Sequence, residues 1–167
     1  MPVPLTVFAR PFLVNPDRRA SWTTPVLVWE AAALRPGTQP NALTVAGALG
    51  PRPTASDPLV LPVAKGNGKL NAFAMGITVG RTENNDLVIA DENVSRFQGY
   101  FQQDPKSGRW SFTDAESTNG SFAGPLRLTP SQAHPLGNRE HLRFGFVELL
   151  FLMPRALFDY LEQRLKD

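Results

Sequence analysis

Three short polar segments between residues 80 and 122 carry side chains that could bind an anion. They are Gly80-Arg81, Val94-Ser95-Arg96-Phe97-Gln98 and Ser117-Thr118-Asn119-Gly120-Ser121-Phe122. Arginine stays charged at physiological pH, and its planar guanidinium can hold two oxygens of one anion. Hydroxyl groups can donate to the same oxygens, and an asparagine amide both donates and accepts. Gly-Arg and Asn-Gly are each common pairs, so the information lies in the order and spacing of the three segments.

The composition is that of a folded protein and is compatible with a reducing cytoplasm. The chain has 167 residues, of which 42% are apolar, and it has no cysteine, which excludes disulfides, thiolate metal sites and a cysteine nucleophile. No apolar run approaches the roughly 20 residues of a membrane span, and the N-terminus does not read as a signal peptide. We therefore expect a soluble, unexported, cytoplasmic chain that contacts no membrane.

The charge balance fits a small anionic ligand better than a polyanion. The formal net charge is +2, and no stretch concentrates Lys and Arg as a nucleic-acid-binding arm would. We therefore expect no nucleic acid among the partners.

The polar segments lie between short apolar runs that predict β-strands. Sixteen prolines and thirteen glycines suit many short strands joined by tight turns, which favours an all-β class. Within Phe97 to Gln103, alternation predicts that Phe97, Gly99 and Phe101 share one face of a strand. The other predicted strands are Leu59–Val63, at a sheet edge because of Pro62, Ile77–Val79, Leu87–Ile89, Trp110–Thr113 after the turn Asp104–Gly108, and the closing pair within Leu142–Met153.

A short amphipathic helix is expected at the C-terminus. Pro154 can begin it, and over Arg155 to Lys166 one stripe holds Leu157, Tyr160, Leu161 and Leu165. This helix should cap the sheet.

The first third of the chain has a different sequence pattern. We predict that residues 1–57 form an N-terminal extension packed on a domain over residues 58–167. Phe12-Leu13-Val14 and Val26-Leu27-Val28-Trp29 are apolar islands that read as short strands. Leu34 to Pro58 is interrupted by prolines and glycines and reads as a loop, with a strand at Ala42 to Val45.

The three polar segments, in this order, resemble the forkhead-associated (FHA) family. Asn85-Asp86 before a strand, Asp114 ahead of Ser117, and the closing Arg143-Phe144-Gly145 belong to the same pattern, which covers about Ile77 to Met153. The resemblance, to the bacterial type with an N-terminal extension, implies an antiparallel β-sandwich that recognises phosphothreonine in a partner protein.

The family's ligand-binding positions fall on Arg81, Ser95, Arg96, Thr118 and Asn119. The resemblance implies that Arg81, Ser95 and Thr118 contact the phosphate, that Asn119 bonds the peptide backbone, and that Arg96 lines the groove. The plain alternatives are a solvated surface arginine at Arg81, a serine that caps its own backbone at Ser95, and a simple turn at Asn119-Gly120.

The chain departs from the family at Gln98, where a histidine that braces the binding loops is usual. A glutamine amide also has a donor and an acceptor, so it could replace that brace with looser geometry. A second departure, Arg139-Glu140 in place of the common Gly-Asp, lies away from these loops.

Nothing in the sequence indicates catalysis. His134 and His141 lack a serine or acid at a recognised spacing, and the sequence contains neither a Walker-type nucleotide loop nor a cluster of metal ligands. We expect no enzyme activity, cofactor or metal. Two hypotheses remain: a phosphothreonine-dependent adaptor in serine/threonine kinase signalling, and a phosphate-independent structural or assembly protein on the same fold.

Overall fold

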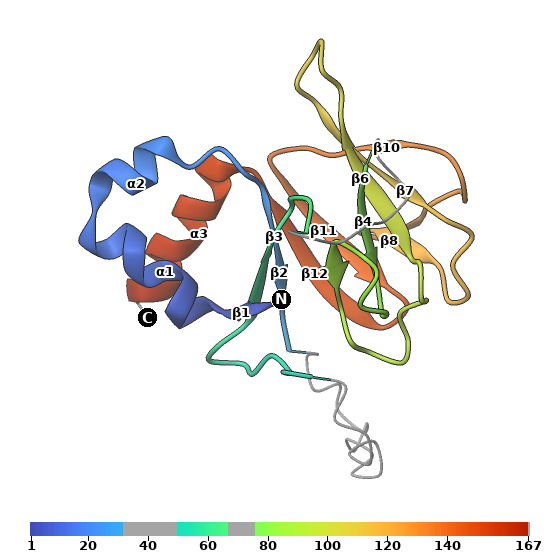
Figure 1. Ribbon diagram of the computed structural model, residues 1–167, viewed down its shortest axis with the longest axis horizontal. Coiled ribbons are helices and arrows are strands. Elements are labelled where there is room, and N and C mark those ends of the chain that lie inside the picture. Colours follow the sequence, from blue (N-terminus) through green and yellow to red (C-terminus); the bar gives the residue numbers. More distant parts are fainter. Residues whose placement is uncertain (32–49, 67–75, 167) are drawn as a thin grey trace.

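The structure is a computed structural model that describes residues 1–31, 50–66 and 76–166, and it places two β-sheets face to face (Figure 1). The seven-stranded sheet has the order β1 (Val3–Pro4), β3 (Leu59–Pro62), β2 (Val26–Trp29), β12 (Val147–Leu152), β11 (Arg139–Phe144), β8 (Ser121–Ala123), β9 (Leu126–Arg127). The five-stranded sheet has the order β10 (His134–Pro135), β7 (Trp110–Asp114), β6 (Gly99–Gln103), β4 (Ile77–Gly80), β5 (Leu87–Val88). Only β4 and β5 pair in parallel, so the predicted antiparallel β-sandwich is confirmed.

The main core lies between the sheets and is built by side chains that alternate along each strand. The rings of Phe101 on β6 and Phe112 on β7 are tilted to each other with their centroids 4.9 Å apart, and Phe112 stacks on Phe144 of the opposite sheet at 5.0 Å. Phe101 also reaches Phe151 on β12 at 5.9 Å. All four rings are fully buried, so their packing joins the two sheets.

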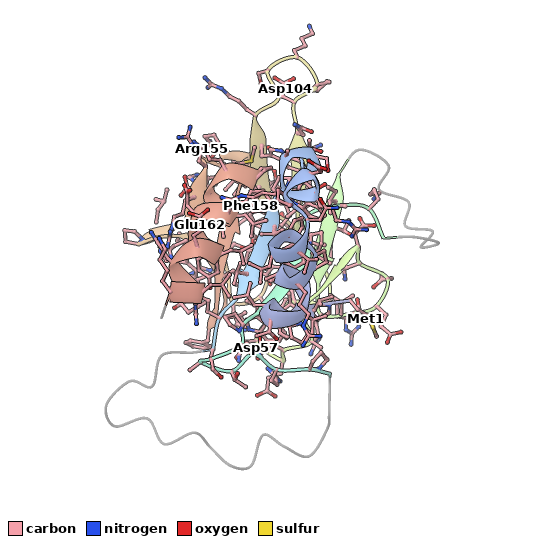
Figure 2. All side chains as sticks on the ribbon, turned by 90° about the vertical axis from the view of Figure 1, so that its left-hand side faces the viewer. Met1, Asp57, Asp104, Arg155, Phe158 and Glu162 are labelled. Carbon is pink, nitrogen blue, oxygen red and sulfur yellow. The ribbon has the colours of Figure 1, made fainter. Side chains whose placement is uncertain are left out.

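A helical layer covers the outer face of the seven-stranded sheet. It consists of α1 (Leu5–Val14), α2 (Pro16–Ser21) and α3 (Pro154–Lys166), and Figure 2 shows α1 and α3 side by side on the face turned to the viewer. Phe12 on α1 packs against Phe158 on α3 at 5.4 Å, and Trp22 closes the cluster at 5.4 Å from Phe12. The C-terminal helix therefore caps the sheet as predicted.

An ion pair ties the layer together at its surface. Arg19 donates to Glu162 at 2.5 Å, and this hydrogen bond holds the pKa of Glu162 below its ordinary value.

The predicted strand at Phe12 to Val14 is wrong, because these residues end helix α1. Leu5 and Ala9 recur at helical spacing and are buried, and Phe12 continues the same side. Pro11 lies inside the helix and hides this periodicity, since proline normally interrupts a helix.

Two further details differ from the sequence prediction. Strand β6 begins only at Gly99, and Phe97 is 41% exposed, so it does not share the buried face of Gly99 and Phe101. On α3, the predicted apolar stripe included Leu165, which is 54% exposed. Phe158, which the stripe left out, is buried.

The remaining predicted elements mostly form where expected. The hairpin of β6 and β7, the strands β3, β4 and β5, and the closing pair β11 and β12 are confirmed. Strand β3 was predicted at a sheet edge because of Pro62. Strand β1 pairs with Leu59 and Val60 of β3, and Pro62 lies beyond this pairing while it pairs with Val26 of β2 on its other side. Arg139 and Glu140 lie within β11, not in a turn before it. The strand predicted at Ala42 to Val45 lies outside the described residues.

Strand β2 belongs to the sandwich itself. It pairs with β12 on one side and with β3 on the other, and Val26, Leu27 and Val28 are fully buried. The division into residues 1–57 and 58–167 stays a prediction, but a cut there removes an inner strand of the sheet. None of the described helices combines the length and apolarity that crossing a bilayer requires.

We predict that a fragment of residues 58–167 will not fold stably. Burial of each large apolar side chain of β2 is worth about 1.5–3 kcal/mol, and a whole domain is stable by only about 5–15 kcal/mol. Circular dichroism during thermal melting should show cooperative unfolding for the full chain and none for the fragment. Limited proteolysis that trims the full chain to a stable core beginning near Asp57 would contradict this.

Candidate functional site

Three loops far apart in sequence meet at one end of the sandwich, opposite the β6–β7 turn (Figure 1). They are residues 81–86 after β4, 89–98 before β6 and 115–120 before β8. The backbone N–H of Arg81 donates to the carbonyl of Ser95 at 2.9 Å, and the N–H of Thr118 donates to the Ser95 hydroxyl at 2.9 Å. The Asn119 side chain donates to the carbonyl of Asn93 at 3.0 Å. These contacts bring Arg81, Ser95, Thr118 and Asn119 to one place.

Gln98 is the fully buried bridge between these loops. Its amide oxygen accepts from the backbone N–H of Ser95 at 3.0 Å. Its amide nitrogen donates to the carbonyl of Gly120 at 3.1 Å and to the hydroxyl of Ser121 at 2.9 Å. Gln98 therefore holds Ser95 and the Gly120–Ser121 segment together, because its amide carries both a donor and an acceptor.

Asp114 extends this network beneath the Ser117 to Gly120 turn. Its carboxylate accepts from the N–H of Ser117 at 3.0 Å and from the hydroxyls of Ser117 and Ser121, each at 2.5 Å. Ser121 thus links Asp114 to Gln98. The carboxylate is almost fully buried and well supplied with donors, so it fixes the turn instead of facing a ligand.

Asn85 anchors the first loop to the second. Its amide nitrogen donates to the carbonyl of Arg96 at 2.6 Å and to that of Thr82 at 2.9 Å. A Cβ on Gly80 would lie 2.1 Å from the same Arg96 carbonyl, so only glycine fits there. Gly80 therefore makes room for the neighbouring loop.

The side chains left at the surface are suited to binding an anion. Arg96, Thr118 and Asn119 are exposed, while Arg81 and Ser95 are half-buried. Within residues 1–31, 50–66 and 76–166, neither Arg81 nor Arg96 forms an ion pair with a carboxylate. The Ser95 hydroxyl accepts from Thr118, which leaves its own proton free to donate.

Two positions at the edge of the site were missed by the sequence reasoning. Asn93 receives the Asn119 side chain through a backbone carbonyl, which no side-chain pattern could signal. Gly145 follows β11 with a φ of +58°, and a Cβ there would lie 2.5 Å from the Asn93 carbonyl. Arg143-Phe144-Gly145 was noted as part of the resemblance, but not as a wall of this site.

In the described part of the chain, no three potential metal ligands gather into a cluster. The loops present hydrogen-bond donors held in place by the fold, together with two arginines.

We predict that Gln98→Ala will lower the free energy of unfolding by about 1–3 kcal/mol, because it removes three hydrogen bonds in the buried bridge and leaves the Ser95 N–H without its partner. Gln98→His should retain more of that stability, since a histidine ring also donates and accepts. Chemical denaturation measures both.

Gln103→Ala is the matched control, because the Gln103 amide is exposed and donates to the Gly108 carbonyl in the distant turn. Its effect should stay within about 0.5 kcal/mol. Equal effects of Gln98→Ala and Gln103→Ala would show that the bridge contributes nothing.

Comparison with known proteins identifies the fold around this site. Residues 77–145 match the family model of the FHA domain. These residues supply all five strands of the smaller sheet and strands β8, β9 and β11 of the larger one. No curated protein has a significant sequence match to the chain.

Solved structures of FHA domains share the fold at low sequence identity. The FHA domain of an Arabidopsis thaliana hypothetical protein aligns with a TM-score of 0.50 at 20% identity, over 78% of this chain and 86% of that chain. The FHA domain of the Chlamydia trachomatis CT664 protein aligns with a TM-score of 0.50 at 14% identity, over 78% and 97%.

A third structure, Mycobacterium tuberculosis EmbR in complex with a low-affinity phosphopeptide, aligns with a TM-score of 0.50 at 18% identity. That match covers 88% of this chain but only 30% of EmbR. Residues 77–145 therefore match the FHA family model, and the likenesses show that this chain has the β-sandwich fold of an FHA domain, which its neighbouring strands complete.

Proposed function

We propose that the chain binds a threonine-phosphorylated segment of a partner protein through Arg81, Ser95, Arg96, Thr118 and Asn119. The observation that carries this proposal is that contacts between separate loops bring Arg81, Ser95, Thr118 and Asn119 together, with Arg96 next to Ser95 in the chain. No carboxylate of the described residues forms an ion pair with either arginine. The FHA family match and the phosphopeptide complex of the similar EmbR structure support the same conclusion.

The chemistry of a phosphothreonine matches the groups present. It brings about −1.5 to −2 charges and three strong acceptor oxygens, so its site needs a permanent cation and fixed donors. Arg81 supplies the cation, next to a buried strand that holds its backbone in place. Ser95 and Thr118 supply hydroxyl groups, and the second charge of Arg96 lines the groove.

Asn119 suits the peptide beside the phosphate. One of its N–H groups is held by the Asn93 carbonyl, which fixes the orientation of the amide. The other N–H and the oxygen remain to bond the N–H and C=O of an extended peptide.

The biological setting that follows is an adaptor downstream of a serine/threonine kinase. A module of this kind holds its partner without changing it chemically. The partner is a threonine-phosphorylated protein, either the kinase itself or one of its substrates.

A second candidate function is phosphate-independent assembly through the helical layer. Helix α1 leaves several apolar side chains in solvent: Val7 is 50%, Leu13 59% and Val14 84% exposed. These side chains favour a protein contact away from the loops. Dependence of binding on the phosphate separates the two candidates.

We predict that Arg81→Ala will weaken phosphopeptide binding about ten- to a hundredfold, because a hydrogen bond to a charged group is worth about 1.5–3 kcal/mol. The melting temperature should change little, since the half-buried Arg81 side chain forms no ion pair with the described carboxylates. Isothermal titration calorimetry measures the affinity.

Arg109→Ala is the matched control, because Arg109 is exposed and lies beside the turn at the other end of β7. It should bind the peptide as the parent does. An Arg81→Ala affinity equal to that of the control would remove Arg81 from the site.

We also predict a several-fold preference for phosphothreonine over phosphoserine. Burying the extra methyl group is worth about 0.8 kcal/mol, and β-branching restricts the side chain before it binds. With Gln98 in place of histidine, we expect this preference to be smaller than is usual for the family. Titration of two peptides that differ only in this residue measures it, and equal affinities would show that no methyl niche exists.

A further inference from the structure

Two arginines flank a phenylalanine on the outer face of the seven-stranded sheet. Phe122 on β8 lies opposite Arg143 on β11 and opposite Arg127 on β9. The guanidinium carbon of Arg143 is 3.8 Å from the centre of the Phe122 ring, and that of Arg127 is 5.7 Å away. The Phe122 ring therefore makes cation–π contacts with both guanidinium groups. The three side chains form a row across β9, β8 and β11.

This row adjoins the loops of the candidate site. A Cβ on Gly120, the residue after Asn119, would lie 3.1 Å from the guanidinium of Arg127, so that group lies against the turn. Arg143 donates to the carbonyl of Gly145 at 2.5 Å, and the N–H of Gly145 donates to the carbonyl of Gly120 at 3.0 Å. A peptide bound at Asn119 would therefore have residues on one side of the phosphothreonine next to these two arginines.

The two arginines of the row form no ion pair among the described residues. The ion pairs of the described residues join Arg19 to Glu162, Arg52 to Asp91 and Lys65 to Asp86, and none includes Arg127 or Arg143. Glu148 lies opposite Arg143 across β11 and β12, but it forms no ion pair with it.

The row is also accessible to a partner. The helical layer packs on the other part of the sheet, over Val26, Val28, Val60, Leu150 and Leu152. Arg127 is exposed, and Phe122 and Arg143 are half-buried. Two supported cations next to a peptide site fit carboxylates, which accept from a guanidinium fork.

We propose that Arg127 and Arg143 bind aspartate or glutamate side chains that flank the phosphothreonine of the partner, and so select acidic sequences around it. This inference rests on the proposed function. It adds a charge preference that the five loop residues do not require. The attraction is between exposed charges, so it should weaken as the salt concentration rises.

The test uses three phosphothreonine peptides with neutral flanks, with three aspartates before the phosphothreonine, and with three aspartates after it. The quantity measured by calorimetry is the ratio of acidic-peptide to neutral-peptide affinity. We expect one acidic peptide to bind the parent chain about three- to tenfold more tightly than the neutral one. In the variant Arg127→Gln/Arg143→Gln this ratio should fall to about one, which is the value for no preference.

Arg109→Gln is the matched control, because it removes the same charge at the other end of the sandwich and should keep the parent ratio. Thermal unfolding of each variant checks that the sheet is intact, and Arg127→Gln alone, which leaves the bond to Gly145 in place, should already reduce the ratio. A ratio of one in the parent, or a ratio that survives the double substitution, would overturn the inference while phosphate-dependent binding remains. Absence of binding to every phosphopeptide would overturn the proposed function as well.

Discussion

The buried amide of Gln98 is the interaction on which the geometry of the site depends. It bonds Ser95 in one loop and Gly120 and Ser121 in another, and these loops carry the residues proposed to contact a phosphate. A buried amide without partners would be costly, so its three hydrogen bonds strongly favour one arrangement of the loops. Among the described residues, no buried side-chain nitrogen or oxygen lacks a hydrogen-bond partner.

Two acidic side chains at the loops, Asp86 and Asp114, are used within the fold. Asp114 accepts from Ser117 and Ser121 beneath the turn. Asp86 accepts from the backbone N–H of Thr78 at 2.9 Å and from Lys65 at 2.8 Å. Both carboxylates are buried, and no ion pair of the described residues includes Arg81 or Arg96.

Much of the sandwich could be predicted because its strands are short, apolar and bounded by turn residues. The prediction failed where one local signal hid another. Alternation continued through Phe97 and Gln98, although the loop turns there to bury the amide and expose the ring. Pro11 concealed a helix whose apolar face packs on the sheet.

The candidate site was predicted in part because its residue types follow a family order. Their proximity depends on backbone contacts, such as the Asn93 carbonyl that holds Asn119, and no side-chain pattern encodes these. Arg127 was missed for a related reason. Arg127 reaches Gly120 because β9 folds back on β8, and the pairing of two such short strands cannot be predicted from their sequence.

The most direct test of the account is a two-dimensional nitrogen–proton NMR titration of the full chain with a phosphothreonine peptide, with its unphosphorylated form as the control. The account predicts that the largest shifts of backbone amide signals will fall on Arg81, Ser95, Thr118 and Asn119, with the control peptide producing none. Shifts confined to α1 and α3, or equal shifts with both peptides, would contradict phosphate recognition at these loops.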